Sequence, residues 1–500
     1  MLIQPDTYIR LIKNCPLDNT YDHTIYFEDE ASQIQYFKNT LNGIPFTKQS
    51  YQRYDKGVLH IQEKAENLYE CNYLMFQNSA FGNKWFYAFV TSIEYVNNVS
   101  SKVYYEIDVM QTWYFNYNLQ CCFVEREHSL TDEIGENLVP ENLELGEYIS
   151  NGANVLSDLL DCSIVIAATH TVENGALNFK NGKIYSLIYS GLFYNIFPAT
   201  NAGVDAANAF ISLDSLLPGG SGIVSIFMMP TKLISDNAFP KILDKTIEKA
   251  YGKFGTFTPK NNKLYTYPYN FLYVSNLQGN NAVYRYEFFS GNNCVFYITG
   301  DTSCNPGVMM TPTNYKGVKN NWDESITLTG FPQCAYTNDA FAAYLSQMST
   351  GANISALASS VANLAVGNVS GVAPTIGSLI DLGRAVVTPN QAKGGSNNST
   401  LFASSVLNFY YANKRITEEF ARIIDGYFNV YGYATRKVKI PNTYSRPHWN
   451  YVQTNKCVIT GSIPADDAIK ICGIYDRGIT FWKKGAEVGN YNLDNTPSWE

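Results

Sequence analysis

Strand-like segments separated by turns dominate the chain between Tyr69 and Val124. Four of them follow one another, with the sequences YECNYLMFQN, KWFYAFVTSIEYV, SKVYYEIDVMQTWYF and NLQCCFVERE. Turn residues at Phe81–Asn83 and Asn97–Ser100 separate them, so the pattern predicts a meander of hairpins. Alternation over Lys102–Asp108 predicts one solvent-facing side, whereas the adjacent aromatics Trp85–Tyr87 predict a strand that is covered on both faces.

The pattern continues in the same style between Asp161 and Thr329. Six further strands are predicted from SIVIAA, KIYSLIYSGLFY, GIVSIFMMP, YNFLYVSN, AVYRYEFFS and CVFYITG. A helix is predicted over Asp236–Tyr251, with Pro240 near its start and Gly252 as its stop. Its apolar stripe would consist of Ile242, Ile247 and Ala250.

Two more helices are predicted near the end of the chain. Asn413–Phe428 is amphipathic, with an apolar face made of Ile416, Phe420 and Ile423. Pro464–Asp476 has Ser462 before it as a cap and Gly478 after it as a stop. The predicted fold class is therefore mainly β with a few helices.

The segment between Asp339 and Asp381 differs from the rest of the chain because it holds no charged residue. It is rich in Ala, Ser and Gly, which let backbones approach closely. Apolar residues follow a helical 3-4-3 spacing on one face, at Ile354, Leu357, Val361 and Leu364. Small or polar residues recur every fourth position on another face, at Gly351, Ser355, Ser359, Asn363, Gly367 and Gly371.

The apolar run Ile354–Val366 would measure about 20 Å as a helix, too short to cross a hydrocarbon core of about 30 Å. A second apolar run, Val372–Val387, is followed by Gly394–Thr400, whose sequence GGSNNST is typical of a flexible tether. Two interpretations remain open: a buried helical pair inside a large domain, or a hairpin stored in a protein-lined cavity that enters lipid later. The tether favours the second, since an element that must change position needs one.

Composition narrows the function classes. A chain of 500 residues is long enough for two to four folded units. Charged residues are only 16% and aromatic residues 14%, and the net charge of −8 gives no global basic surface for binding nucleic acid. The start lacks the pattern of a signal peptide. The ten cysteines show no CxxC or zinc-type spacing, so we expect reduced, mostly buried thiols.

Catalytic signatures are absent from the sequence: GxSxG, HExxH, GxGxxG and GxxxxGK[ST] do not occur. The acidic pairs Glu418–Glu419 and Asp466–Asp467 fall in the first turns of predicted helices, where the helix dipole stabilises carboxylates. His128 is interpreted as a strand-end residue in a polar network rather than a general base. Exposed aromatics leave an alternative open, a cell-wall-binding or cell-wall-degrading protein that stacks on sugars.

Two blocks of sequence resemble a known family. Asn72–Asn116, followed by Phe123–His128, closely resembles the tail knob, or distal tube, proteins of the small short-tailed bacteriophages of the picovirus group that infect Gram-positive bacteria. The C-terminal motifs HWNYV at 448–452, GSIP at 461–464 and DRGITFW at 476–482 are similar to the same family. The order and spacing of these motifs agree with the family from near residue 1 to residue 490.

The resemblance implies β-barrel or sandwich modules that form a hollow homohexameric tube, through which the genome leaves the tail. In that family a long hydrophobic loop of each subunit plugs the bore and later forms a pore in the host membrane. The implied partners are a lower collar above, a tail tip protein below, the host membrane and passing double-stranded DNA bound without sequence specificity. The protein would be a virion tail component made in the host cytoplasm, with no catalytic, cofactor-binding or metal-binding residues.

Carried over onto this chain, the resemblance divides it into four parts. Residues 1–160 would begin the tube domain, 161–330 would form a second β-rich domain, 331–410 the plug with its tether, and 411–500 a return segment that completes the tube. The plug residues would be Ile354, Leu357, Val361, Leu364, Gly367, Gly371, Ile376, Leu379 and Ile380. The tube residues that carry the family motif would be Gln77, Asn78, Gly82, Asn83, Lys84, Trp85, Asp108, Gln111, Thr112, Trp113, Arg126, Glu127 and His128.

Overall fold

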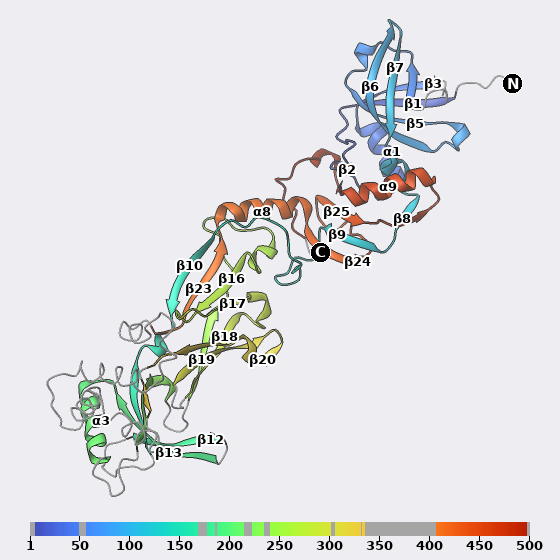
Figure 1. Ribbon diagram of the computed structural model, residues 1–500. Coiled ribbons are helices and arrows are strands. Elements are labelled where there is room, and N and C mark those ends of the chain that lie inside the picture. Colours follow the sequence, from blue (N-terminus) through green and yellow to red (C-terminus); the bar gives the residue numbers. More distant parts are fainter. Residues whose placement is uncertain are drawn as a thin grey trace, which may run out of the picture. The chain divides into compact units, whose positions relative to one another are not determined.

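The computed structural model describes residues 6–49, 57–168, 178–185, 188–214, 223–234, 241–301, 306–331, 333–335 and 407–497 (Figure 1). Strands predominate among these residues, which confirms the prediction of a mainly β protein with a few helices. The chain forms two compact units. Unit 1 contains residues 1–146, 253–264 and 417–500, and unit 2 contains residues 147–252 and 265–416.

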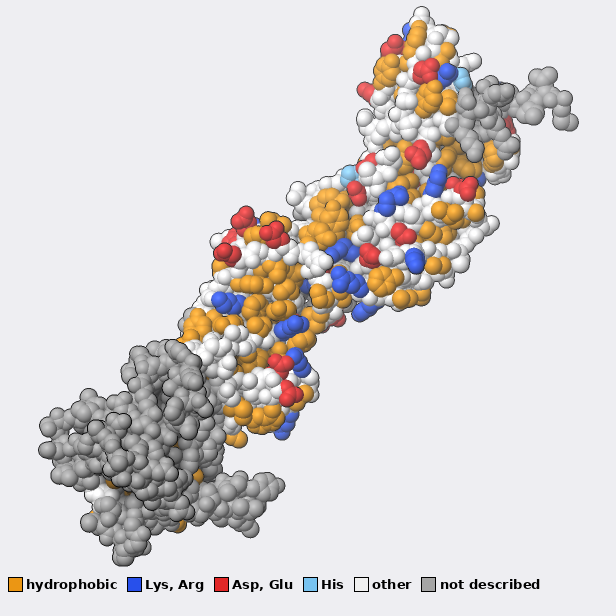
Figure 2. Space-filling model, viewed as in Figure 1, with side chains coloured by type: hydrophobic (Ala, Val, Ile, Leu, Met, Phe, Trp, Pro, Cys, Tyr) orange, Lys and Arg blue, Asp and Glu red, His pale blue; other side chains and the backbone are white. Residues whose placement is uncertain are grey.

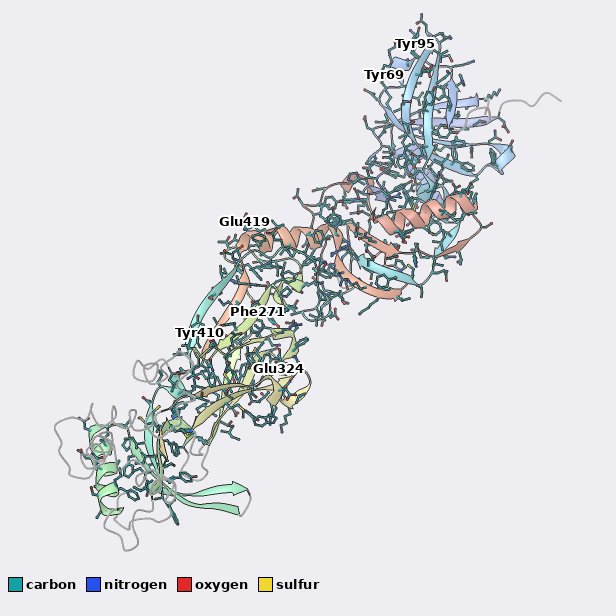
Figure 3. All side chains as sticks on the ribbon, in the orientation of Figure 1. Tyr69, Tyr95, Phe271, Glu324, Tyr410 and Glu419 are labelled. Atoms are coloured by element: carbon teal, nitrogen blue, oxygen red, sulfur yellow. The ribbon has the colours of Figure 1, made fainter. Side chains whose placement is uncertain are left out.

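Unit 1 begins with a six-stranded antiparallel sheet, which contains the hairpin meander expected from the sequence. Its strands lie in the order β3 (Gly43–Gln49), β1 (Thr7–Lys13), β5 (Cys71–Gln77), β6 (Trp85–Asn97), β7 (Ser100–Ile107) and β4 (Val58–Ile61). The buried residues of β7 alternate with more exposed ones, as predicted. Tyr69, just before β5, and Tyr95 of β6 are labelled in Figure 3 and are both exposed.

A second sheet of unit 1 combines early and late parts of the chain. Its order is β2 (Thr24–Ile25), β27 (Ile479–Trp482), β25 (Trp449–Asn455), β9 (Cys122–Glu127) and β24 (Tyr433–Lys439). A small pair joins β8 (Tyr117–Leu119) to β26 (Ile459–Gly461). The helices of the unit are α1 (Glu30–Gln35), α2 (Val109–Trp113), α8 (Glu418–Tyr431) and α9 (Ala465–Arg477).

Two hydrophobic cores cover the two faces of the six-stranded sheet. Trp85 and Tyr87 belong to one core, which also contains Ile471 and Tyr475 of α9. Phe86 packs against the other core, around Leu74. The strand with three adjacent aromatics is therefore covered on both faces, as the sequence predicts.

The described residues of unit 2 form three antiparallel sheets. The first has the order β10 (Tyr148–Val155), β23 (Tyr410–Ile416), β16 (Asn270–Ser275) and β17 (Asn281–Tyr284). The second has the order β12 (Asn178–Tyr185), β13 (Ile188–Pro198), β11 (Cys162–Ala168), β14 (Ile223–Pro230) and β22 (Gln333–Ala335). The third has β15 (Ile242–Glu248), β18 (Asn293–Asp301), β19 (Gly307–Tyr315) and β20 (Val318–Asn320), with β21 (Ile326–Thr329) also paired to β19.

The core of unit 2 is rich in aromatic side chains. Tyr284, Phe289, Phe296 and Tyr315 contact one another, and the ring centroids of Tyr284 and Phe296 lie 5.0 Å apart. Figure 3 labels Phe271 and Tyr410, which come from the neighbouring strands β16 and β23. The abundant aromatics of the sequence thus serve largely as core, which is the ordinary role of cross-strand aromatic pairs.

The prediction of a helix over 236–251 is wrong for those of its residues that the structure describes. Residues 242–248 form strand β15, which pairs along its length with β18 at the edge of a sheet. Only Ile247 of β15 is buried, so tertiary pairing and not an amphipathic stripe determines the conformation. The helix of this region is α3 (Asn201–Asp214), which the sequence analysis did not predict and which packs Val204 and Phe210 against its sheet.

The C-terminal helices lie near their predicted positions, with corrections. Residues 413–416 belong to β23, and α8 starts only after its cap, Thr417. Its buried face is wrongly predicted, because Ile423 is 61% exposed while Ala421, Ile424, Asp425 and Phe428 are buried. Helix α9 ends at Gly478 as expected, but no Ser462 cap is formed and Pro464 occupies the N-cap position.

Two further expectations can be compared with the structure. Residues 109–113, predicted as part of a strand, form helix α2, because the Asp108 side chain caps it. Most cysteines in the described part are buried, and the eight assigned there are free thiols, as predicted. The plug residues from Ile354 to Ile380 lie outside the described residues. Among the residues that are described, no helix is both long and apolar enough to span a bilayer.

Candidate functional site

The first group of family-motif residues forms the turn between β5 and β6. The Asn78 side chain accepts a hydrogen bond from the Ala80 amide (2.8 Å) and donates to the hydroxyl of Thr7 (2.7 Å). Gly82 and Asn83 both have positive φ, at 65° and 56°, a backbone conformation that glycine and asparagine adopt most readily. Gln77 pairs across the turn with Trp85. These residues therefore fix the geometry of one hairpin.

Lys84 and Trp113 connect this hairpin to the C-terminal part of the chain. The Lys84 ammonium lies 4.5 Å from the centroid of the Trp113 ring and donates to the side chain of Asn116 (2.5 Å). The indole nitrogen of Trp113 donates to Asp467 in the first turn of α9 (2.9 Å). Burial lowers the pKa of Lys84 below its usual value. The cation, the ring and the carboxylate together hold α9 beside α2.

A buried network surrounds Asp108 and Gln111. Asp108 accepts hydrogen bonds from the Gln111 amide (3.1 Å) and the Tyr73 hydroxyl (2.8 Å). The Gln111 side chain donates to the Ile25 carbonyl (2.9 Å). Burial raises the pKa of Asp108 to about 6, although these hydrogen bonds oppose the change. Thr112 accepts from the Tyr87 amide (3.0 Å), so the network ties α2 to β6.

Arg126 lies on β9 in a buried ion cluster with Glu141 and Lys263. The Lys263 ammonium donates to one oxygen of Glu141 (2.6 Å), and Arg126 donates to the other. The same Glu141 accepts from the Ala434 amide (2.8 Å). The side chains of Glu141 and Lys263 are only 1% and 3% exposed, and burial lowers the pKa of Lys263. The cluster joins four separate stretches of unit 1.

Glu127, the last residue of β9, and His128, which follows it, are both buried. Glu127 accepts from Lys439 (2.5 Å) and from the Asn442 amide (2.9 Å). The His128 ring accepts from the Tyr451 amide (2.8 Å) and donates to the Asn429 carbonyl (3.2 Å). Burial lowers the pKa of His128 to about 3, so the ring is neutral at physiological pH. A neutral histidine with both nitrogens occupied is a structural residue, in agreement with its interpretation from sequence.

Gly432 allows this sheet to pack against α8. It ends the helix with φ of 65°, and a Cβ atom there would lie 2.2 Å from the Glu127 carbonyl oxygen. A side chain at this position would therefore push β9 away from the helix. The Gly432 carbonyl also accepts from Arg126 (2.7 Å).

Two buried acids of unit 1 were missed from the sequence. Asp425 of α8 accepts from the backbone amides of Lys260 (3.1 Å) and Asn261 (2.9 Å), and Asp132 accepts from the Tyr433 hydroxyl (2.5 Å). Burial raises the pKa of both carboxyl groups. These two acids anchor residues 253–264 in unit 1, although the residues on either side of that segment belong to unit 2. An acid among the apolar residues of α8 is a visible signal, but its partners are remote in sequence.

The thirteen motif residues thus all lie in unit 1, and their polar groups bind strands and helices to one another. Within the described ranges, no group of three or more His, Cys, Asp or Glu side chains is arranged to hold a metal ion. The hydrogen bonds and ion pairs of the motif residues connect the elements of unit 1 as in a structural framework.

Comparison with known proteins gives the family. Residues 5–118 match the model for the caudoviral major tail protein N-terminus. Residues 235–496 match the model for the C-terminal domain of the Bacillus phage phi29 tail knob protein gp9, which covers more than half of the chain. The chain therefore belongs to this tail knob family, as the resemblance predicted. It is a structural protein of the virion tail and not an enzyme, which excludes the cell-wall-degrading alternative.

Several relatives match over nearly the whole length. The tail knob proteins gp9 of Bacillus phages PZA and phi29 are each 26% identical to this chain over 591 aligned positions, which cover 98% of both proteins. The solved structure of the bacteriophage C1 tail knob protein gp12 has a TM-score of 0.62 at 15% identity. It covers 98% of this chain and 99% of its own, so the two share the fold.

Proposed function

We propose that six copies of this chain form a hollow tube at the end of a phage tail, and that double-stranded DNA leaves through it. Residues 340–387 of each copy close the bore until host contact, then enter the host membrane as a pore. The proposed neighbours are a lower collar above and a tail tip protein below. The proposal is supported by similarity over nearly the whole chain to tail knob proteins.

One observation supports the proposed plug most directly: in the sequence, the uncharged segment is inserted between two strands of unit 2. Before it, β22 pairs with β14. After it, β23 lies between β10 and β16 and pairs with both. A segment held by a strand at each end can move without releasing the subunit from its position. Its composition fits storage away from water, because an exposed apolar surface of that size promotes aggregation.

The net charge of the chain supports the proposal that DNA passes through the tube. The chain has a net charge of −8, and a tube lining dense in Lys and Arg would instead bind phosphates and retard the passing duplex. On the visible face of the described residues, charged side chains are scattered among hydrophobic and uncharged ones (Figure 2). Subunit interfaces are depleted in charge and enriched in aromatic residues at their cores.

In this proposal residues 1–160 and 411–500 build the tube domain, 161–330 a second β-rich domain, and 331–410 the plug and its tether. The compact unit that contains residues 1–146 and 417–500 supports the first assignment. In the membrane, small-residue faces of the hairpins pack together, and Asp381 and Arg384 stay at the water boundary or pair. The lipid-facing side chains are Ile354, Leu357, Val361, Leu364, Ile376, Leu379 and Ile380.

Deletion of Asn353–Val387 tests the membrane role. The deleted protein should assemble as the full chain does and should no longer release dye from liposomes. A control of full length, with serine at Ile354, Leu357, Val361 and Leu364, should also lose leakage, because the apolar face and not chain length inserts. Leakage that survives both changes would contradict the membrane role.

A further inference from the structure

The edge of the second sheet of unit 1 carries an exposed strip that is both basic and apolar. In the described part of the chain, β24 is the last strand of this sheet and pairs on one side only, with β9. Val438 is 72% exposed and Ile440 is 57% exposed, and Phe123, the register partner of Val438, is 38% exposed. Arg436 and Lys437 of the same strand are also exposed, and Lys437 lies on the face opposite to Val438 because it pairs with Val124. We call these five residues the basic strip.

Protection of the sheet edge accounts for only part of this strip. Charged residues on an edge strand prevent unwanted pairing with other strands, and Arg436 and Lys437 fit that role. Two largely exposed aliphatic side chains in the same strand have the opposite effect. Neither Arg436 nor Lys437 has an ion-pair partner among the described residues. An apolar strip flanked by unpaired cations is the kind of surface that binds an acidic and apolar partner.

Unit 1 itself presents a surface with the complementary character at the start of α8. Glu419 lies in the first turn of the helix and is exposed (Figure 3), and Ile423, one turn later, is 61% exposed. Glu144 is exposed as well, and it lies two residues before Gly146, whose backbone packs on the ring of Phe420. We call Glu144, Glu419 and Ile423 the acidic patch. The neighbouring Glu418 and Arg422 neutralise each other (2.7 Å).

The two surfaces cannot meet within one molecule. Helix α8 has 14 residues and is about 20 Å long, and the acidic patch is at its beginning, whereas β24 follows its end. Figure 1 accordingly draws the start of α8 well away from β24 within unit 1. Two different complementary surfaces on one chain produce head-to-tail contacts, and such contacts close into a ring when the rotation between copies permits.

We propose that the basic strip of one copy binds the acidic patch of the next copy, and that this contact forms the ring. The inference rests on the proposed tube and names the surfaces that build it. Val438, Ile440 and Phe123 of one copy would cover Ile423 of its neighbour, and the cations would pair with Glu144 and Glu419 around them. Apolar centres with a charged rim are typical of specific interfaces.

Charge reversal in the full-length chain tests the contact, with sedimentation velocity as the measurement. Arg436→Glu with Lys437→Glu, or Glu144→Lys with Glu419→Lys, should each weaken association by at least about tenfold, because like charges then oppose each other. A chain that carries all four changes should associate again, since the two surfaces regain opposite charge. A structural defect would not be cured by a second pair of changes on a distant surface.

Matched controls use exposed charges elsewhere in unit 1. Glu66→Lys and Lys470→Glu alter the same kinds of charge and should leave association as in the unmodified chain. The proposed interface would be contradicted if both double variants assembled like the unmodified chain, or if the variant with all four changes did not associate again. Either result would leave the proposed tube unaffected. An unmodified chain that remains a monomer at every concentration would overturn both the interface and the proposed tube.

Discussion

The two sheets of unit 1 are stabilised by different kinds of side chain. In the six-stranded sheet, buried aromatic and aliphatic residues such as Leu74 and Tyr87 fill both faces. In the second sheet, the strand β9 is surrounded by buried ions, including Glu141 and Lys263. A buried ion pair adds little net stability compared with apolar packing, but it fixes which groups must meet. The difference indicates that the second sheet, which joins remote parts of the chain, depends on specific partners.

The largest effect should follow from breaking the buried ion cluster. Glu141→Gln leaves the charges of Lys263 and Arg126 without a carboxylate in a buried site. We expect the free energy of unfolding of unit 1 to fall by about 4 to 5 kcal/mol. Chemical denaturation of the full chain, followed by tryptophan fluorescence, measures this loss.

Replacement of both Glu141 and Lys263 tests whether unpaired charge causes the loss of stability. Glu141→Leu combined with Lys263→Met removes the charges together, so it should recover a substantial part of the stability lost in Glu141→Gln. If the double variant is as unstable as the single one, unpaired charge is not the cause of the loss.

An apolar deletion in the six-stranded sheet should behave differently. Leu74→Ala removes a fully buried side chain and leaves a cavity, so we expect a loss of about 3 kcal/mol. Combination with a second cavity variant more than 10 Å away should give an additive loss, with no recovery. The same denaturation experiment tests this expectation, and recovery in such a pair would remove the contrast between the sheets.

The pH dependence of stability should change when Asp108 is replaced. Burial raises its pKa in the folded state to about 6, above the unfolded value of about 3.9. The folded state therefore binds the proton more tightly, and the group's contribution to stability decreases as the pH rises from about 4 to about 6. The decrease amounts to about 3 kcal/mol.

Asp108→Asn removes the titrating group and keeps an amide oxygen that can still accept from the Gln111 backbone, although the amide nitrogen then replaces the oxygen that accepts from Tyr73. The difference in unfolding free energy between the variant and the unmodified chain should grow in favour of the variant from pH 4 to pH 7. A difference that stays constant over this range would contradict the protonation of Asp108.

The smallest effect concerns the contact between α2 and α9. Trp113→Phe retains an aromatic ring but loses the hydrogen bond from the indole nitrogen to Asp467. We expect a loss of about 1 kcal/mol. Asp467→Asn should give a similar or smaller loss, and the two changes together should cost less than their sum, as a double-mutant cycle in denaturant would measure.

The pattern of hydrophobic and polar residues predicted those strands that are recognisable from their own sequence. Ser100–Ile107 alternates clearly, Trp85–Asn97 is rich in aromatic and β-branched residues, and turn residues separate the two, so both strands were visible without tertiary information. β15 was not predicted as a strand, because it is an edge strand whose sequence also fits the apolar stripe of a helix. The buried face of α8 was misassigned because the amides at 260–261 stabilise Asp425 there, and that contact spans 165 residues of sequence.

The candidate site was predictable only as a set of motif residues. Asp108 shows its capping role locally, since it precedes α2 directly. Glu141 and Lys263 gave no signal, because the buried ion cluster forms only when four distant stretches of chain come together. Sequence resemblance identified Arg126 but could not supply its partner.

One measurement tests the central claim most directly: electron microscopy of the purified full-length protein, with no symmetry imposed. The account predicts rings of six subunits around a bore, with density across the channel that is lost in the chain lacking Asn353–Val387. Rings of another number, a solid particle, or a bore that is open in the unmodified protein would contradict it.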